Sequence, residues 1–343
     1  MTLAERLVAT WYAPRPDALA LVLAPLAGVF ALASGLRHAL YRLRVLPRHR
    51  ALEPVIVVGN IAAGGTGKTP LVIALATALA ARGWQPGVVS RGTGAHGRDA
   101  RVVANDDVAE DVGDEPLLMA RRGLKVAVAR RRIDAVRALR VAHPGCDVII
   151  ADDGLQHYAL ERDVEIACVD GARGFGNGWL LPAGPLRERR SRLARVDAVV
   201  VTGQRTAPGL PGGAYAMRLE PEGVVNVAKP GPPRPPAVLA SEVVHAVAGI
   251  GNPERFFVAL RALGLEVVPH AFPDHHHYRP GDLAFGNGVV LMTEKDAVKC
   301  TRFADARWWF LRVRAALDDT LVDHIVARLP PRAPDRRLPG LAI

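Results

Sequence analysis

The segment that most constrains this chain is Gly64-Gly65-Thr66-Gly67-Lys68-Thr69-Pro70, which directly follows the apolar run 55–58. A buried strand that leads through a glycine-rich turn into a helix binds nucleotide triphosphates, because backbone N–H groups and the helix N-terminus face the phosphates. In such a site Lys68 reaches the β- and γ-phosphates, and the Thr69 hydroxyl ligates Mg²⁺. We therefore predict that residues 64–69 bind ATP and Mg²⁺. Ala62 departs from the general motif, which has glycine at this position.

A second element, residues 146–154, indicates the metal side of the same site. It reads as a buried parallel strand that ends in the adjacent carboxylates Asp152 and Asp153. Nucleotide-binding enzymes of this type use an acid at such a strand end to hold Mg²⁺, directly or through water. Neighbouring side chains on a strand point to opposite faces, so only one of the two carboxylates faces the metal unless the strand ends there. The alternative is a solvated turn, and the residues alone leave open which acid binds.

The composition indicates a folded, reduced protein. The chain has 343 residues, of which 50% are hydrophobic and 23% charged, which is enough for one large core or two medium ones. Its three scattered cysteines do not form a disulfide or zinc pattern. The net charge of +10 comes almost entirely from arginine, without a basic stripe that carries interleaved aromatics. We therefore expect no nucleic-acid partner, and either an anionic membrane surface or an anionic substrate accounts for the charge.

Residues 18–36 carry no charge and predict a membrane helix. Nineteen residues span roughly 28 Å at about 1.5 Å each, which is enough to enter or cross a bilayer core. More arginines follow this run than precede it, and the positive-inside rule then places the body of the protein in the cytoplasm. A signal peptide and a buried soluble helix are the alternatives. The long preceding region and the need for cytoplasmic ATP argue against the first, and Pro25 and Gly28 argue against the second.

Apolar strands alternate with helical stretches after this helix, which predicts an α/β fold with a parallel sheet covered on both faces. The expected strands are 54–59, 86–90, 125–129, 147–151, 164–169 and 197–202, with helices at 69–82 and 131–142. Strand-like segments and a proline run follow, and the α/β rhythm then resumes with a helix at 253–263 and strands near 245–249, 288–293 and 308–313. We expect an anchor with a basic flank (1–50), a P-loop core (51–210), a β/proline linker (211–237), a second smaller α/β lobe (238–330) and a loose tail (331–343).

Two further segments carry candidate proton-transfer groups. Asp114 and Glu115 stand between Gly113 and Pro116, just before a helix expected to run on from Leu117. They are either N-capping acids or a base and a metal-side carboxylate that face the phosphates. The run 272–278, FPDHHHY, contains adjacent histidines, and a His–Asp pair that tunes proton transfer is a better interpretation than a metal site or a solvated loop.

The segment 181–188, LPAGPLRE, opens an arginine-dense stretch. Because arginine binds phosphate in a bidentate manner, a substrate phosphate or a lipid headgroup can be recognised here. Arg187, beside the Pro-Ala-Gly-Pro turn, is the candidate. A solvated basic helix face is the alternative for the arginines that follow it.

In order and spacing, these segments together resemble the tetraacyldisaccharide 4'-kinase family of lipid A biosynthesis over about residues 10–315. The matching motifs are VGN at 58–60 with GGTGKTP, SRG at 90–92, GDEP at 113–116, DDG at 152–154 with Gln156 and His157, LLPAGPLRE at 180–188, FPDHH with Tyr278, and TEKD at 293–296. Members also lack the first P-loop glycine, so Ala62 fits the family. The chain departs from it at Thr93, where an aromatic residue is common, and at Leu155, where phenylalanine is usual.

The resemblance implies an inner-membrane enzyme that faces the cytoplasm and phosphorylates the 4'-hydroxyl of a tetraacylated glucosamine disaccharide 1-phosphate. It makes Asp114 the catalytic acid/base residue, assisted by His275 or His276. A lipid substrate also accounts for the membrane helix. The candidate residues, grouped by role, are Asp114, His275, His276 and Lys68 for catalysis, Gly64 to Thr69 for ATP, Thr69, Glu115, Asp152 and Asp153 for Mg²⁺, and Asn60, Arg91, Gln156 and Arg187 for substrate.

A membrane-linked P-loop ATPase switch of the metallochaperone or partitioning type is the alternative function. It would use residues 275–277 as a metal site and ATP hydrolysis to change partners. Such switches often carry a second lysine just before the two glycines, where this chain has Ala63. An assay with labelled ATP and the acylated disaccharide separates the two functions.

Overall fold

The computed structural model describes residues 3–92 and 99–331, so Thr93 and residues 332–343 of the expected tail lie outside the described residues. The helices are α1 Leu3–Trp11, α2 Ala18–Arg42, α3 Lys68–Ala81, α4 Ala109–Val112, α5 Asp114–Arg121, α6 Arg132–Ala142, α7 Pro253–Ala262, α8 Glu294–Cys300 and α9 Asp319–Val326. The strands are β1 Val55–Gly59, β2 Pro86–Ser90, β3 Arg101–Val102, β4 Lys125–Val128, β5 Val148–Asp152, β6 Val164–Asp170, β7 Ala198–Thr202, β8 Tyr215–Asn226, β9 Val244–Ala248, β10 Val267–Ala271, β11 Val289–Thr293 and β12 Trp308–Leu317. Short 3₁₀ helices occupy Arg190–Arg195, Pro236–Leu239 and Pro280–Leu283.

All the described strands join one mostly parallel sheet in the order β10-β9-β11-β12-β8-β7-β6-β1-β5-β2-β4-β3. Among these strands two neighbouring pairs are antiparallel, β12 with β8 and β3 with β4. The mixed α/β class with a large parallel sheet is as predicted. The six strands expected between residues 54 and 202 and the helices expected at 69–82 and 131–142 each form within one residue of their predicted limits. Sequence reading succeeds here because buried parallel strands are continuous apolar runs.

The two faces of the sheet in residues 51–210, called the P-loop lobe, carry separate cores. Alternate residues of β1 divide between them: Ile56 and Val58 pack on the side of α3 and α5, whereas Val55 and Val57 pack on the side of α6. This alternation follows from the two-residue period of a strand. Helices on both faces leave the carboxyl ends of β1, β5 and β6 open at one edge, where ligands of such sheets bind.

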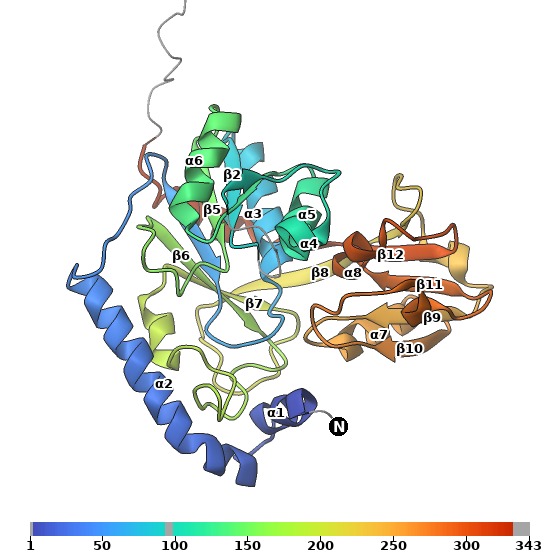
Figure 1. Cartoon of the computed structure of the whole chain (residues 1–343), viewed down its shortest axis with the longest axis horizontal. Helices are drawn as coiled ribbons and strands as arrows, with labels where there is room; N and C mark the ends of the chain where they lie inside the picture. Colours follow the sequence, from blue (N-terminus) through green and yellow to red (C-terminus); the bar gives the residue numbers. More distant parts are fainter. Residues whose placement is uncertain (1–2, 93–98, 332–343) are drawn as a thin grey trace, which may run out of the picture.

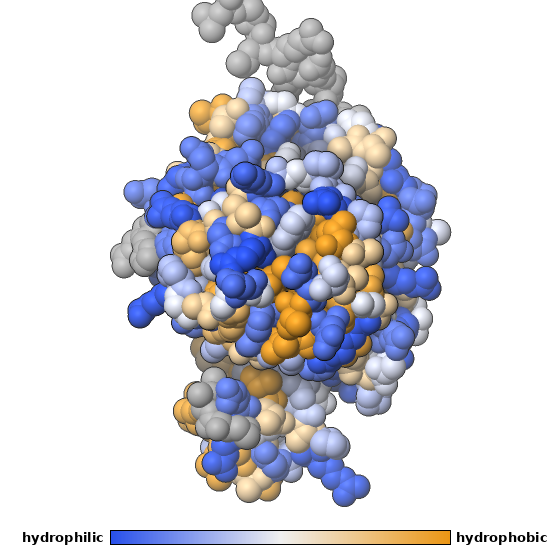
Figure 2. Space-filling view, turned by 90° about the vertical axis from the view of Figure 1, so that its right-hand side faces the viewer, coloured by the Kyte–Doolittle hydropathy of each residue, from blue (hydrophilic) through white to orange (hydrophobic). Residues whose placement is uncertain are grey.

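Residues 238–317, called the second lobe, continue the same sheet (Figure 1), whereas α9, which was expected in this lobe, packs beside α3 in the core of the P-loop lobe. Within the segment expected as a linker, β8 is a twelve-residue strand that pairs with β7 at its start and with β12 along most of its length. The connection between the lobes is therefore a pair of long antiparallel strands, and Figure 1 shows β8 crossing from one lobe to the other. Figure 2 views the second-lobe side of the molecule, where apolar surface gathers in a patch surrounded by polar side chains.

Helix α2 runs along the flank of the P-loop lobe with most of its apolar surface uncovered (Figure 1). It is 25 residues long and apolar enough to cross a membrane, and only 11% of its most apolar window is buried. Side chains that face outward include Val22 and Leu32, both 74% exposed. Helix α1, by contrast, is held to the body, because the Trp11 indole donates to the Pro182 carbonyl and the Tyr12 hydroxyl to the Ala63 carbonyl.

Candidate functional site

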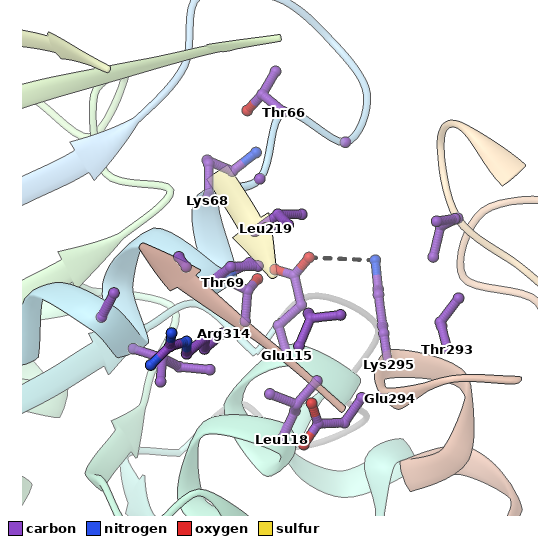
Figure 3. Close-up of a pocket in the computed structure, with 18 of the residues that line it drawn as sticks. Thr66, Lys68, Thr69, Glu115, Leu118, Leu219, Thr293, Glu294, Lys295 and Arg314 are labelled. Atoms are coloured by element: carbon purple, nitrogen blue, oxygen red, sulfur yellow. Dashed lines mark ion pairs between the residues drawn. The ribbon is translucent and has the colours of Figure 1, made fainter. Parts of the chain in front are cut away.

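A cleft of about 790 Å³ lies between the two lobes and brings most of the predicted site residues together. Its walls come from the P-loop segment 64–70, the start of α5, the loop 274–275 and the junction of β11 with α8. In Figure 3, Lys68 and Thr69 of the P-loop lobe lie on one side, and Lys295 of the second lobe lies on the other. The arrangement places the end of a nucleotide-binding turn opposite acidic and basic side chains from both lobes.

The P-loop segment has the backbone that its glycines predict. Gly67 has a φ of +89° and caps α3, and a Cβ there would lie 2.9 Å from the Thr202 hydroxyl. That hydroxyl donates to the Thr66 carbonyl at 2.9 Å, which fixes the turn against β7. From the second lobe, Gly251 packs so closely that a Cβ on it would lie 2.6 Å from the Gly65 nitrogen. The turn is thus held by its own lobe and touched by the other.

Asp153 forms ion pairs with two basic side chains beside this turn. Its Oδ1 lies 3.5 Å from Lys68 Nζ, and its Oδ2 lies 3.2 Å from Arg187 Nη1. The residue has a φ of +45°, because β5 has already ended at Asp152 and the chain turns sharply. Burial alone would raise the pKa of Asp153, but the charges of Lys68 and Arg187 outweigh it and lower that pKa. Three predicted residues therefore form one ionised cluster.

Asp152 is fully buried and faces the same edge of the sheet. Its Oδ2 accepts from the Ser90 hydroxyl at 3.2 Å, and its Oδ1 has no hydrogen-bond partner among the described residues. Burial, followed by the carboxylates of Glu115 and Asp153, raises the pKa of Asp152 to about 7. An unpartnered carboxylate oxygen among other acids fits a divalent cation, and hard oxygen donors are what Mg²⁺ prefers. The donor set present here is compatible with the predicted metal.

Asp114 and His275 meet across the lobes, although 161 positions separate them in the chain. His275 Nδ1 lies 2.9 Å from Asp114 Oδ2, and the other Asp114 oxygen accepts the Glu115 N–H at 2.9 Å. Helix α5 begins at Asp114, so both acids lie inside its first turn; our expectation of a helix running from Leu117 was three residues late. Burial favours a higher pKa for Asp114, but the His275 hydrogen bond and the charge of Lys295 lower it to about 2.

His276 faces away from this pair. Its Nε2 lies 3.2 Å from Asp282 Oδ2, and its ring packs against those of Phe272 and Tyr278. The backbone reverses at His275, which has a φ of +61°, so the adjacent histidines point to different partners. A shared metal site at 275–277, as the ATPase-switch alternative requires, has no support in this geometry.

Lys295 is a site residue for which the sequence supplies a motif but no role. It is one of five lysines in the chain and follows β11 in the TEKD segment. Its Nζ lies 3.3 Å from Glu115 Oε1, an ion pair drawn in Figure 3, and 3.3 Å from Asp274 Oδ1. The same nitrogen lies 3.2 Å from His275 Nε2. The rarity of lysine in an arginine-rich chain was the available signal.

The predicted substrate residues divide into two groups. Arg187 lines the cleft, whereas Asn60, Gln156 and Arg91 do not. Asn60 is buried and donates to the Ala62 carbonyl, and its own carbonyl accepts from Gln156 Nε2 at 2.9 Å. Gln156 also donates to Glu188, so Asn60 and Gln156 support the turn beside Arg187. Arg91 is exposed after β2.

The arginine-dense stretch after Arg187 is mostly structural. Arg192 is buried and pairs with Glu165 at 2.6 Å and with Glu188 at 3.3 Å. Arg190 donates to the Gly209 carbonyl and lies over the Phe175 ring. These two guanidinium groups already have protein partners. Of the residues considered in this stretch, Arg187 therefore remains the candidate for binding a phosphate.

Comparison with known proteins identifies one family throughout. The family model described as Tetraacyldisaccharide-1-P 4'-kinase matches residues 19–330. The chain is 50% identical over 311 residues to the tetraacyldisaccharide 4'-kinase of Methylobacillus flagellatus, covering 90% of this chain and 92% of the relative. It is 46% identical over 340 residues to that of Pseudomonas aeruginosa, covering 96% and 100%.

Among solved structures, the chain resembles the "apo" form of LpxK from Aquifex aeolicus in complex with ATP. The two share 28% sequence identity with a TM-score of 0.75, and the match covers 91% of this chain and 100% of the other. The likeness therefore includes both lobes and is not confined to the nucleotide-binding motif.

Proposed function

Because this chain belongs to the tetraacyldisaccharide 4'-kinase family and is a kinase of lipid A biosynthesis, we propose that the cleft between its lobes is where phosphate is transferred. The γ-phosphate of ATP passes to the 4'-hydroxyl of a tetraacylated glucosamine disaccharide 1-phosphate. The observation that carries this proposal is the placement of Lys68 and Thr69 in one cleft with His275, whose Nδ1 lies within hydrogen-bond distance of Asp114.

ATP binds with its phosphates on the P-loop segment. Backbone N–H groups of residues 64–67 and the N-terminus of α3 face the phosphates, and Lys68 neutralises the β- and γ-phosphate charge. Support comes from the left-handed Gly67 and from the relative solved in complex with ATP. Lys68 exchanges its contact with Asp153 for the phosphates, because a phosphate carries more charge than one carboxylate.

Thr69, Asp152 and Glu115 would hold Mg²⁺, with Asp153 beside them. When bound, the ion supplies positive charge that neutralises the phosphate oxygens as charge moves during transfer. The support is the unpartnered Asp152 oxygen and the raised pKa of that carboxyl. A bound cation would offset the cost of burying a carboxylate beside other acids. The protein contributes a fixed set of oxygens, since Ser90 orients Asp152.

Asp114 accepts the proton of the attacking hydroxyl. Its pKa of about 2 keeps the carboxylate ionised and able to accept at physiological pH. His275 holds the carboxylate in place and shares the proton load, since the Asp114 hydrogen bond, opposed by burial, raises the pKa of this histidine. Because His275 comes from the second lobe, proton transfer depends on the lobes being in contact.

Helix α2 places the enzyme on a membrane, where its lipid substrate lies. Its uncovered apolar surface enters the bilayer, and the arginines after it put the catalytic body on the cytoplasmic face of the inner membrane. Arg187, beside the P-loop segment, contacts a phosphate of the substrate or of ATP.

The test of the activity uses labelled ATP and the acylated disaccharide 1-phosphate with the full-length protein in detergent micelles. We expect label at the 4'-position, and loss of transfer in Lys68→Ala. Transfer to no acceptor by the wild-type protein, or wild-type turnover in Lys68→Ala, would contradict the assignment.

The membrane location has its own test. Removing residues 1–36 also removes the Trp11 and Tyr12 contacts, so substitution on α2 is the cleaner change. We expect Val22→Asp with Leu32→Asp to release the protein from membranes into a salt wash without detergent. The matched control is Val141→Asp on α6, which is 84% exposed. If the wild-type protein itself washes off with salt, the embedded helix is excluded.

A further inference from the structure

We propose that a basic pocket at the C-terminal end of α2 binds the phosphate group of an anionic phospholipid. The pocket has a volume of about 540 Å³ and lies between α2, the loop that follows it, and the segments 158–165 and 192–197. Of the described residues, none lines both this pocket and the cleft between the lobes. Because α2 runs along the flank of the P-loop lobe (Figure 1), the pocket lies beside the helix whose apolar surface is uncovered. The inference goes beyond the transfer reaction and rests only on the proposed contact of α2 with a membrane.

The charges that line the pocket do not balance. Five arginines and three carboxylates line it. Glu165 is shared by Arg162 and Arg192, at distances of 3.0 Å and 2.6 Å. Asp163 and Asp197 each pair with an arginine outside the pocket, at 2.8 Å and 3.4 Å. All three carboxylates therefore have basic partners already, and net positive charge remains in the pocket.

The remaining charge belongs to Arg42, Arg48 and Arg195. Arg42 ends α2, Arg48 lies in the loop after it, and Arg195 ends the 3₁₀ helix Arg190–Arg195. None of the three side chains has an ion pair or a hydrogen bond to another described residue. Guanidinium groups that share one cavity repel each other, and an anion between them removes this cost. A phosphate group fits, because its oxygens accept two N–H donors from one guanidinium group.

The surroundings of the pocket favour a lipid over a soluble phosphate. Leu43, Val45 and Leu52 belong to the segment that follows α2, and their side chains are 73%, 66% and 73% exposed. This segment is fixed to the body, because the His49 N–H donates to the Ala159 carbonyl at 2.7 Å. Exposed apolar side chains beside a phosphate site match the acyl chains and the headgroup of one phospholipid. Basic pockets next to membrane helices bind anionic headgroups in this way.

The 1-phosphate of the acylated disaccharide is the competing occupant. Arg187 lines the cleft, but its neighbour in the chain, Glu188, faces the pocket residues. Tyr158 donates to Glu188 at 2.7 Å, and Arg192 pairs with it at 3.3 Å. These contacts separate the pocket from the cleft, so a phospholipid in the pocket leaves the cleft open to the disaccharide. The two occupants therefore predict different effects on the KM for the disaccharide.

The experiment compares two full-length variants that each lose three arginines. The pocket variant carries Arg42→Gln, Arg48→Gln and Arg195→Gln. The matched control changes three arginines outside the pocket that likewise have no ion pair among the described residues: Arg140→Gln, Arg218→Gln and Arg302→Gln. Native mass spectra of delipidated protein in nonionic detergent measure the binding of phosphatidylglycerol, and of phosphatidylcholine with the same acyl chains. We expect the pocket variant to bind phosphatidylglycerol about 10²-fold more weakly than the wild type, the combined effect of three arginines at one headgroup, and the control to match the wild type.

Three further arms identify the source of the phosphate. Glycerol 1-phosphate, which lacks acyl chains, should bind far more weakly than phosphatidylglycerol. The KM for the acylated disaccharide 1-phosphate should stay within about twofold of the wild type in the pocket variant. Arg42→Lys, Arg48→Lys and Arg195→Lys together keep the charge and should preserve most of the lipid binding.

Four results would overturn the proposal. They are equal affinity of the pocket variant and the control for phosphatidylglycerol, equal binding of phosphatidylglycerol and phosphatidylcholine by the wild type, binding of glycerol 1-phosphate as tight as that of the lipid, and a rise in the KM for the disaccharide without a loss of lipid binding. The binding measurement needs no phosphate transfer, so its outcome is separate from that of the proposed reaction.

Discussion

Two clusters of charge in the same cleft are built in different ways. The first, which holds Lys68, Asp152, Asp153 and Arg187, comes entirely from the P-loop lobe: from the start of α3, the end of β5 and the loops. The second, which holds Asp114, His275 and Lys295, joins α5 of that lobe to two segments of the second lobe. The first can form without the second lobe, and the second cannot.

This difference separates binding from chemistry. Phosphate and metal contacts depend on strand order in one sheet, which is fixed once that lobe has folded. If Asp114 and His275 have the roles proposed above, proton transfer depends on a hydrogen bond between the lobes, and so on their relative position. On this proposal the enzyme binds ATP whether or not the two lobes are in contact, but it transfers phosphate only when they are. Substitutions in one cluster or the other test whether ATP binding and turnover are lost separately.

The largest effect is expected at Lys68. Replacing it by alanine removes the main cation of the one-lobe cluster, and we expect kcat to fall about 10²- to 10³-fold, the scale for losing a key electrostatic contact. ATP affinity falls with it, because the same charge acts in the ground state. Steady-state kinetics and ATP titration measure both. Lys125→Ala, which alters a lysine that hydrogen bonds Gln85 away from the cleft, is the control and should match the wild type.

Asp114→Ala should distinguish the roles of the two clusters, because it should lower turnover without lowering ATP affinity. We expect kcat to fall about 10²-fold, within the usual contribution of a positioned acid or base, while the dissociation constant of ATP stays within about twofold. His275→Ala in the same protein should then cost far less than it does alone, since the pair acts as a unit. His276→Ala serves as the control, because its partner is Asp282. Additive losses in this double-mutant cycle would mean that Asp114 and His275 work separately.

The contrast between the clusters also explains what the sequence could predict. Glycine conformation, strand burial and helix start act over a few residues, so GGTGKTP and the strand ending at Asp152 are readable as local patterns. The choice of His275 over His276 depends on a backbone reversal and on a helix 161 positions away, for which no local pattern exists. The resemblance named the histidine pair, but only the contact separates its members.

The remaining misses have the same cause. Arg192 looked available for phosphate because its partner Glu165 lies on β6, 27 positions earlier in the chain. The expected linker was read from its prolines, although the preceding residues pair along β12 as β8. In both places the decisive partner is distant in the sequence, and propensity cannot report it.

Substitution of Arg122 tests whether the contact between the lobes contributes to the free energy of unfolding. Its guanidinium group is 9% exposed, pairs with Glu294 and Glu222, and donates to the Val313 carbonyl. We expect Arg122→Met to lower the free energy of unfolding by about 3 kcal/mol, because Glu294 loses its partner at a mostly buried position, whereas Glu222 keeps its pair with Arg312. Arg314→Met, which breaks the exposed pair with Glu220, should cost less than about 1 kcal/mol. Urea unfolding measures both.

The same substitution should affect the two clusters unequally. With Arg122→Met we expect kcat to fall several-fold, while ATP affinity stays near that of the wild type. Equal stability of the Arg122→Met and Arg314→Met variants, or a loss confined to ATP binding, would remove the idea that this ion pair holds the second cluster together.

The smallest effect is expected from pH, through two histidines with opposite shifts. Burial, with the charges of Arg132 and Arg162, lowers the pKa of His157 to about 4, whereas the Asp114 hydrogen bond raises that of His275. Between about pH 6.5 and 4 the unfolded chain binds a proton at position 157 that the folded one does not, so His157 reduces stability as pH falls through this window. His275 does the opposite: its contribution is complete below about pH 6.5 and is lost as pH rises through its folded pKa.

Glutamine substitutions should therefore change the pH dependence of unfolding in opposite directions. We expect His157→Gln to make the stability difference between pH 8 and pH 5 about 1 kcal/mol smaller, a value reduced for partial solvent screening. His275→Gln should make that difference larger, because it removes a group that favours the folded state at low pH. Urea unfolding at the two pH values gives both slopes. If both variants shift the slope in the same direction, the pKa values of His157 and His275 are not displaced in opposite directions, and the lowered pKa of the one or the raised pKa of the other is wrong.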